Sequence, residues 1–251
     1  MRIPAAAFLL AIAATAAPAQ TVVPRYVAAA IADPSRPAAH RASDARRHTA
    51  ELVAFSEATP GSHVVELIPG YGQFTRVFSR IVGPKGRVYA LWPEEYARMS
   101  QGNVKELRAL GATDGYRNIS VVVQPAATFA APTPLDVVFT SQNYHDYPNA
   151  FMGKLDPMVF NRAVFRALKP GGAFIVIDHA AAPGSGLRDT ETLHRIDEAA
   201  VRRQVEAAGF EFAGSLDILR NPADARTLKV FDPAVRGRTD QFVLKFRKPR
   251  R

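Results

Sequence analysis

Short, continuous apolar runs recur along most of the chain. They are typical of strands covered on both faces, because alternate positions are as apolar as their neighbours. Helical patterns over Gln73–Val82, Glu94–Leu110 and Met158–Leu168 separate several of the runs. This alternation predicts an α/β fold with a doubly wound, mostly parallel sheet. The five runs are His63–Ile68, Arg87–Trp92, Ile119–Gln124, Leu135–Thr140 and Ala173–Asp178.

Further elements are expected on both sides of these runs. Two short helices are predicted over Tyr26–Ala32 and Ser43–Ala58, and another over Asp197–Ala208. Two late β-like runs, Phe210–Leu219 and Gln241–Phe246, bring the expected sheet to seven strands. We therefore expect an N-terminal helical extension over residues 20–60 and one domain over residues 61–248.

The first 19 residues have the pattern of a secretory signal peptide. Arg2 precedes a short Ala/Leu/Ile run, and small residues lead to a cleavage site after Ala19. Cleavage predicts a periplasmic or secreted protein with no membrane-spanning segment, and an uncleaved anchor is the alternative. The absence of cysteine suits an oxidising compartment and excludes thiolate chemistry.

The chain is basic, with a formal charge of +9 over 251 residues. Such a surface attracts anions at long range. No basic-and-aromatic stripe accompanies the charge, so a solvated surface is favoured over nucleic-acid binding. The oligomeric state is left open.

A loop after the first apolar run carries two glycines. Glu66 lies near the end of the run, Gly70 and Gly72 follow, and a helical pattern begins at Gln73. Because glycine lacks a Cβ, such a turn lets backbone approach a nucleotide-like ligand. A dinucleotide-binding turn would have a third glycine where Thr75 stands, and the Gly-Lys-Ser/Thr of a phosphate loop is missing. Both of those interpretations are disfavoured.

Three motifs in order resemble those of class I S-adenosylmethionine-dependent methyltransferases. They are the glycine turn at residues 66–72, the fourth-strand segment at 136–146, and the "LKPGG" segment at 167–178. The resemblance covers roughly residues 53–248 and implies a Rossmann-like sheet whose last strands form an antiparallel pair. The Pro-Gly-x-Gly turn, the N-terminal segment and Arg-x-x-Asp-x-x-Arg at 41–47 resemble a branch of exported bacterial methyltransferases.

The resemblance implies S-adenosylmethionine as the cofactor, bound at the glycine turn. Gly70 and Gly72 would admit its methionine part, and Glu66 would accept a hydrogen bond from its ammonium. Tyr71 either shapes the mouth of the site or covers the core. The cofactor-binding residues that we predict are Glu66, Pro69, Gly70, Tyr71, Gly72, Trp92 and Glu94.

Three positions depart from the family's pattern. Ile68 replaces its first glycine, Trp92 stands where an acid holds the ribose, and Pro125 replaces a glycine after the third strand. Glu94 would replace the ribose acid only if its loop bends back, whereas Trp92 would stack on adenine. A non-catalytic ligand-binding protein with the same fold is therefore the alternative to an active methyltransferase.

The residues after the fourth predicted strand are candidates for the substrate side. His145 is either a general base near neutral pH or a structural histidine against Asp146. Asn143 either holds a polar group of the substrate or caps the turn. We take His145 and Asn143 as the predicted catalytic residues and expect a small-molecule or envelope substrate.

Two further groups lie outside these predicted sites. Asp178 and His179 resemble a metal or acid/base pair, but no third ligand is close in sequence, so no metal site is predicted. His194 is expected in a lid or in packing.

Four residues from Arg41 to His48 share roughly one helical face. That face either folds over the site and grips an anionic substrate or forms a surface ion-pair ladder. The four are Arg41, Asp44, Arg47 and His48.

Overall fold

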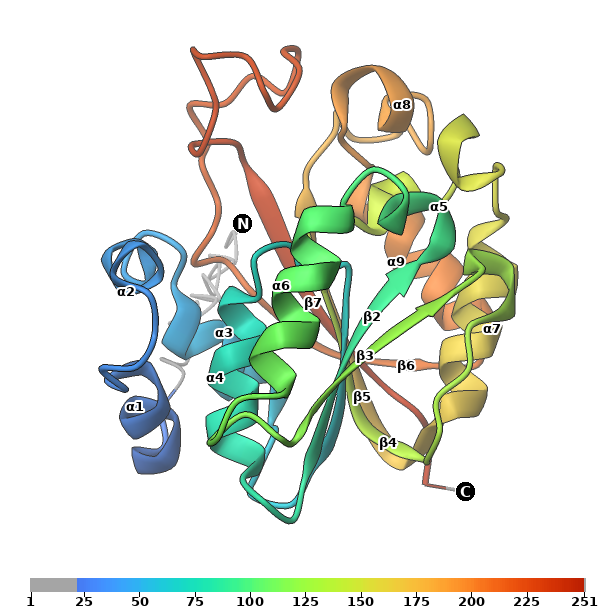
Figure 1. Ribbon diagram of the computed structural model, residues 1–251. Coiled ribbons are helices and arrows are strands. Elements are labelled where there is room, and N and C mark those ends of the chain that lie inside the picture. Colours follow the sequence, from blue (N-terminus) through green and yellow to red (C-terminus); the bar gives the residue numbers. More distant parts are fainter. Residues whose placement is uncertain (1–21, 251) are drawn as a thin grey trace, which may run out of the picture.

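Seven strands form one twisted sheet in the computed structural model, which describes residues 22–250 (Figure 1). Their order across the sheet is β3-β2-β1-β4-β5-β7-β6. The predicted signal peptide lies outside the described residues. The strands are β1 His63–Leu67, β2 Arg87–Pro93, β3 Ile119–Gln124, β4 Leu135–Ser141, β5 Leu168–His179, β6 Glu211–Leu216 and β7 Gln241–Arg247.

The sheet is parallel apart from β7, which runs antiparallel to both β5 and β6. The predicted doubly wound fold with a late antiparallel pair is confirmed. The direction of winding reverses between β1 and β4, which are neighbours in the sheet. In such folds the ligand lies beyond the carboxyl ends of the strands at this reversal.

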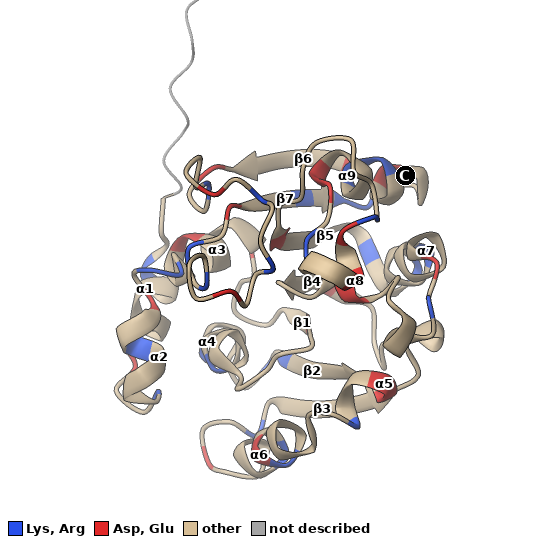
Figure 2. Ribbon diagram, turned by 90° about the horizontal axis from the view of Figure 1, so that it is seen from above, with Lys and Arg blue, Asp and Glu red and all other residues tan. Residues whose placement is uncertain are grey.

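Helices cover both faces of the sheet. Figure 2 shows α3, α4 and α6 on one side and α7 and α9 on the other. The helices are α1 Arg25–Ile31, α2 Ala38–Ser43, α3 Thr49–Ser56, α4 Gln73–Val82, α5 Glu94–Ala97, α6 Gln101–Gly111, α7 Pro157–Ala167, α8 Thr190–Leu193 and α9 Glu198–Ala207. Short 3-10 turns lie at Ala126–Thr128, Tyr144–Asp146 and Ala150–Met152.

The core explains why the site is held firmly in place. Val64 and Val65 of β1 are fully buried, so this strand is covered on both faces. Phe74 and Phe78 of α4 pack on Phe139 of β4 with ring centroids 4.9 and 5.2 Å apart. Aromatic pairs at such distances stabilise packing beyond their buried area. The helix that follows the glycine turn is therefore fixed to β4 as well as to β1.

Several boundaries differ from the expectation. The predicted helix over 94–110 is two helices, because α5 ends at Ala97 and α6 begins after Ser100. The helix expected from Ser43 begins only at Thr49, because His48 has a left-handed backbone that cannot continue a right-handed helix. β5 begins at Leu168 and not at the expected Ala173, because Leu168 already pairs with Leu135 of β4.

The helices of the described part of the chain are all too short or too polar to cross a membrane.

Candidate functional site

The loop between β1 and α4 is built from left-handed residues. Ile68, Gly70 and Gly72 have φ angles of 49°, 56° and 73°. A Cβ on Gly72 would lie 2.4 Å from a methyl carbon of Leu107, whereas a Cβ on Gly70 would meet nothing within 4 Å. The left-handed backbone of Ile68, a β-branched residue, costs about 1–3 kcal/mol. The chain thus keeps the shape of a glycine turn even where glycine has been replaced.

Glu66 is buried below this turn, with 4% of its surface exposed. Burial raises the pKa of its carboxyl to about 8, although a hydrogen bond from Thr75 and the charges of Arg47 and Arg76 act in the opposite direction. The carboxyl is therefore largely protonated at neutral pH. A cation arriving beside it would favour the carboxylate.

A cavity of about 350 Å³ opens at the turn, and we call it the turn cavity. Five of the predicted cofactor-binding residues line it: Glu66, Pro69, Gly70, Tyr71 and Trp92. The Trp92 side chain is fully buried, and its indole Nε1 has no hydrogen-bond partner among the described residues. Tyr71 is 67% exposed, which excludes the core-covering alternative and places it at the rim.

Two predicted cofactor residues lie elsewhere. Gly72 is not in the lining of the turn cavity and instead caps the N-terminus of α4. Glu94 lines a separate groove, where it faces Arg98 at 3.9 Å, because the chain enters α5 directly after Pro93. The expected bend of Glu94 towards the ribose position is therefore not present.

Asn143 joins β4 to the glycine turn. Its side-chain nitrogen donates to the carbonyl groups of Leu67, Ile68 and Ser141 at 3.0–3.3 Å, and its oxygen accepts from Thr140. It also lines the turn cavity. Since its polar atoms are already paired, the turn-capping alternative is favoured over substrate binding.

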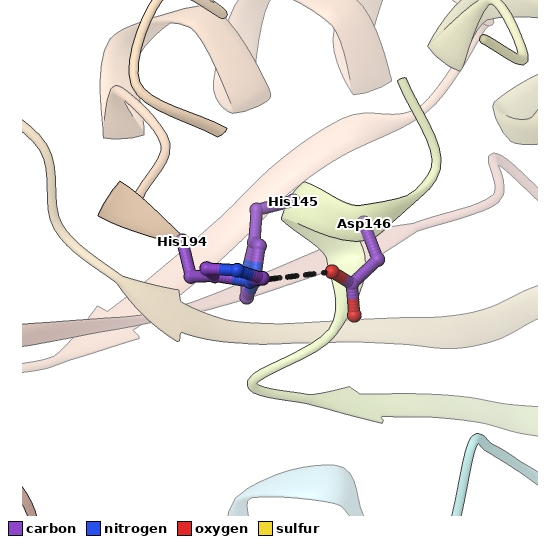
Figure 3. A group of neighbouring side chains, drawn as sticks. All are labelled: His145, Asp146 and His194. Carbon is purple, nitrogen blue, oxygen red and sulfur yellow. Dashed lines mark hydrogen bonds and ion pairs between the residues drawn. The ribbon is translucent and has the colours of Figure 1, made fainter. Parts of the chain in front are cut away.

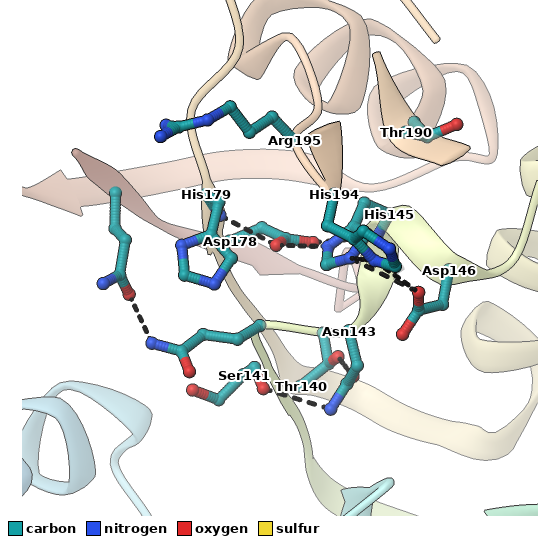
Figure 4. A network of polar contacts seen from close by, with 12 residues as sticks. Thr140, Ser141, Asn143, His145, Asp146, Asp178, His179, Thr190, His194 and Arg195 are labelled. Atoms are coloured by element: carbon teal, nitrogen blue, oxygen red, sulfur yellow. Dashed lines mark hydrogen bonds and ion pairs between the residues drawn. The ribbon is translucent and has the colours of Figure 1, made fainter. Parts of the chain in front are cut away.

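His145 is buried beside Asp178 at the carboxyl ends of β4 and β5 (Figure 4). Its Nδ1 lies 2.7 Å from one oxygen of Asp178, and its backbone N–H donates to the other at 2.8 Å. Burial disfavours a charged imidazole, but the charge and hydrogen bond of Asp178 outweigh it and raise the pKa of His145. The predicted structural partner Asp146 lies farther away, at 3.3 Å from Nε2.

His179, at the end of β5, has a different environment. Burial lowers its pKa to about 4, although Asp178 opposes the shift, so this imidazole is neutral at physiological pH. Its Nδ1 lies 2.7 Å from the hydroxyl of Thr239.

Of the four residues predicted to share one helical face, some form hydrogen bonds and ion pairs away from the site, and one reaches the site. Arg41 donates to the carbonyl of Pro34, and Asp44 pairs with the buried Arg36 at 2.7 Å. Arg47 alone of the four reaches the site: it lines the turn cavity, and its buried Nε has no hydrogen-bond partner among the described residues.

A second cavity, of about 390 Å³, adjoins the first, and we call it the arginine cavity. Arg46, Arg47 and Arg236 line it together with His179, and none of the described residues in its lining is acidic. Burial and the nearby charge of Arg46 lower the pKa of Arg47. The two cavities share four lining residues, Arg47, Phe74, Ser141 and Gln142.

Several lining residues had no sequence signal. Tyr96, Ser100 and Asn103 enter the turn cavity from the α5–α6 region, which was expected to be one uninterrupted helix. Gln142 has a left-handed backbone at φ 64° and lines both cavities. In the sequence, the turn expected after β4 was the one feature that could have pointed to Gln142.

Comparison with known proteins now adds to the geometry. The family model "Protein-L-isoaspartate(D-aspartate) O-methyltransferase (PCMT)" matches residues 21–158, more than half of the chain. The ubiquinone/menaquinone biosynthesis C-methyltransferase of Vibrio cholerae is 29% identical over 181 residues. This match covers 69% of the chain and 63% of the relative, so the chain spans less than two thirds of that relative's length.

Solved structures share the fold. One from Galdieria sulphuraria, described as a sarcosine dimethylglycine methyltransferase, has a TM-score of 0.61 at 13% identity, with 91% of this chain and 92% of the other covered. A glycopeptide N-methyltransferase complexed with S-adenosylhomocysteine has a TM-score of 0.53 at 18% identity, with 80% and 87% covered. The chain therefore belongs to the protein-L-isoaspartate(D-aspartate) O-methyltransferase family and has the fold of S-adenosylmethionine-dependent methyltransferases.

Proposed function

We propose that this protein is an exported S-adenosylmethionine-dependent methyltransferase whose acceptor is a small anionic molecule. The observation that carries the proposal is the pair of adjoining cavities, one at a glycine turn and the other lined by three arginines. Family membership supports the reaction class, and the arginines support the charge of the acceptor.

The residues of the turn cavity fit the cofactor. The space beside Gly70 would admit its methionine part, since no side chain occupies the position of a Cβ there. Glu66 would accept a hydrogen bond from the ammonium after losing its proton. The free N–H of Trp92 is a donor for the nucleoside part, which carries several acceptors. When bound, the cofactor supplies a methyl group on a positively charged sulfur.

Methyl transfer to a good nucleophile depends mainly on alignment. Arg47, Phe74 and Gln142 line both cavities, so a methyl donor in the turn cavity and an acceptor in the arginine cavity would contact the same three residues. Phe74 would keep water from the meeting point, and Arg47 would hold the acceptor by a charge-assisted hydrogen bond. His145 does not line the arginine cavity, so no role as a base for this acceptor is assigned to it.

An anionic acceptor explains the charge of the arginine cavity. Three guanidinium groups around one cavity without an acidic residue repel each other, and an anion would relieve that repulsion. Planar guanidinium groups bind carboxylate and phosphate with two parallel hydrogen bonds. Carboxylates, including an isoaspartyl peptide as suggested by the family description, are therefore the first acceptors to test.

The test uses the full chain, methyl-labelled S-adenosylmethionine and matched anionic, neutral and cationic acceptors. Transfer to an anion is expected, with KM raised about tenfold or more in Arg236→Gln, because a hydrogen bond to a charged group contributes about 1.5–3 kcal/mol. Arg117→Gln is the control, since its side chain is exposed and pairs with Asp114. Preference for neutral or cationic acceptors would overturn the assignment of the acceptor.

A ligand-binding protein that has lost transfer is the second candidate, and the strained Ile68 at a glycine position favours it. It predicts binding of S-adenosylhomocysteine without transfer to any acceptor. Complete transfer with one acceptor would exclude it.

Export rests on the first 19 residues. Cells producing the chain with a C-terminal tag should release it with the periplasmic fraction, beginning at Gln20. Recovery from the cytosol with the N-terminal segment intact would contradict export.

A further inference from the structure

Three potential metal ligands converge just after β4, where His194 comes in from a distant loop (Figure 3). Among the described residues, His145, Asp146 and His194 place one ligand atom each within 4.8 Å of the others. His145 Nε2 lies 3.3 Å from His194 Nδ1 and 3.3 Å from Asp146 Oδ1, and the latter two atoms are 3.7 Å apart. Two imidazoles and one carboxylate form the ligand set of many catalytic zinc and iron(II) sites.

The distances match the geometry of a bound ion. A zinc ion about 2.1 Å from each ligand, at tetrahedral angles, separates neighbouring ligand atoms by about 3.4 Å. The three observed separations, 3.3, 3.3 and 3.7 Å, are close to this value. Only small side-chain movements are therefore needed to bring all three atoms to bonding distance.

Asp178 orients His145 for such a role. The carboxylate accepts a hydrogen bond from the ring Nδ1–H at 2.7 Å, which leaves the Nε2 lone pair directed at the other two ligands (Figure 4). A carboxylate behind a ligating histidine is the usual outer partner of a metal site.

His194 is held in place by its backbone. It lies between α8 and α9, and next to it Ile196 pairs with Ala180 as an extension of β5. The residue has a left-handed conformation at φ 55°, which is uncommon for a residue other than glycine. Its ring also lies against Phe231, with centroids 4.9 Å apart. The loop thus brings the imidazole of His194 against His145, which follows β4 and lies 49 residues earlier in the sequence.

The three ligands line one cavity of about 420 Å³, which we call the histidine cavity. Tyr96 and Gln142 line both this cavity and the turn cavity, and His179 lines both this cavity and the arginine cavity. An ion held by these three ligands would therefore lie in a cavity that adjoins the turn cavity, where we place the methyl donor. A three-ligand site with an open position is the catalytic type.

We propose that His145, Asp146 and His194 bind one divalent transition-metal ion, whose open position takes an oxygen of the acceptor. Two imidazoles favour Zn²⁺, Fe²⁺ or Co²⁺ over Mg²⁺, which prefers oxygen ligands. Metal binding itself does not depend on the proposed methyl transfer. Only the role of the ion in holding the acceptor rests on that function.

The test is a calorimetric titration of the full chain, stripped with chelator, with Zn²⁺ and separately with Mg²⁺. We expect about one Zn²⁺ per chain and no Mg²⁺ at the same concentration. Asp146→Asn removes the charge but keeps the side-chain volume. His194→Asn removes the imidazole, and asparagine tolerates the left-handed backbone of this position. Each should weaken Zn²⁺ binding about tenfold or more.

His48→Asn is the matched control, because His48 is also left-handed but pairs with Glu51 outside the three cavities described above. Its Zn²⁺ affinity should equal that of the wild type. Absence of stoichiometric Zn²⁺ binding, or equal binding by wild type, Asp146→Asn and His194→Asn, would overturn the proposal and leave a hydrogen-bonded histidine pair. A parallel titration of the stripped protein with S-adenosylhomocysteine reports separately on the proposed function.

Discussion

The buried carboxyl of Glu66 should make the stability of the protein depend on pH. Burial raises its pKa to about 8 from an ordinary value of 4.5. Between these two pH values the folded protein keeps a proton that the unfolded chain has lost. The stabilisation is therefore complete below pH 4.5, and the free energy of unfolding falls as the pH rises to about 8.

The size of the effect follows from the same two values. Each pH unit is worth about 1.4 kcal/mol, so the whole interval corresponds to about 5 kcal/mol, and relaxation around the charge reduces this to about 2–5 kcal/mol. Glu66→Gln keeps the volume and an oxygen that accepts from Thr75, but it does not ionise. The difference in the free energy of unfolding, variant minus wild type, should therefore increase by about 2–5 kcal/mol between pH 4.5 and pH 8.

The assay is urea unfolding of both proteins, followed by circular dichroism at pH 4.5, 6, 7 and 8. Other titrating groups contribute equally to both proteins and cancel in the difference. A difference that stays constant over this range would refute the burial argument. The variant should also bind S-adenosylhomocysteine more weakly, because the ammonium loses its carboxylate partner.

Three further substitutions test other parts of the structure. Ile68→Gly should be more stable than Ile68→Ala by about 1–2 kcal/mol in urea unfolding, because alanine pays for the left-handed backbone; the reverse order would show that the strain is absent. Gly70→Ala should cost only about 1–2 kcal/mol in stability, since its Cβ meets nothing, yet weaken S-adenosylhomocysteine binding in calorimetry; unchanged binding would place the cofactor elsewhere. Asp224→Ala should lower the free energy of unfolding by about 3–5 kcal/mol, because the fully buried Arg195 loses the carboxylate that it pairs with at 2.8 Å. The control Asp114→Ala removes an exposed ion pair and should lower it by about 1 kcal/mol or less. Equal melting temperatures of the two variants would contradict this reasoning.

The central strands could be predicted from the sequence because they are buried on both faces. Val64 and Val65 of β1 leave no polar alternation, whereas β6 at the edge of the sheet alternates exposed and half-buried positions. The boundaries at His48 and Ser100 were missed for a physical reason. A left-handed residue and a break between two helices depend on contacts that periodicity does not contain.

The sequence predicted those site residues that lie at the ends of neighbouring strands. Glu66 and Trp92 end adjacent strands, so their meeting at one cavity followed from the expected topology. His194 joins His145 through a loop whose path is set by the pairing of Ala180 with Ile196. No local sequence pattern specifies the path of this loop. The sequence therefore gave no reason to place His194 beside His145 and Asp178.

Calorimetric titration of the full chain with S-adenosylhomocysteine is the most direct test of the cofactor site. We predict one site per chain, with affinity reduced about tenfold or more in Gly70→Ala and unchanged in Arg117→Gln. No binding at millimolar concentration, or equal binding by all three proteins, would show that the glycine turn is not a cofactor site.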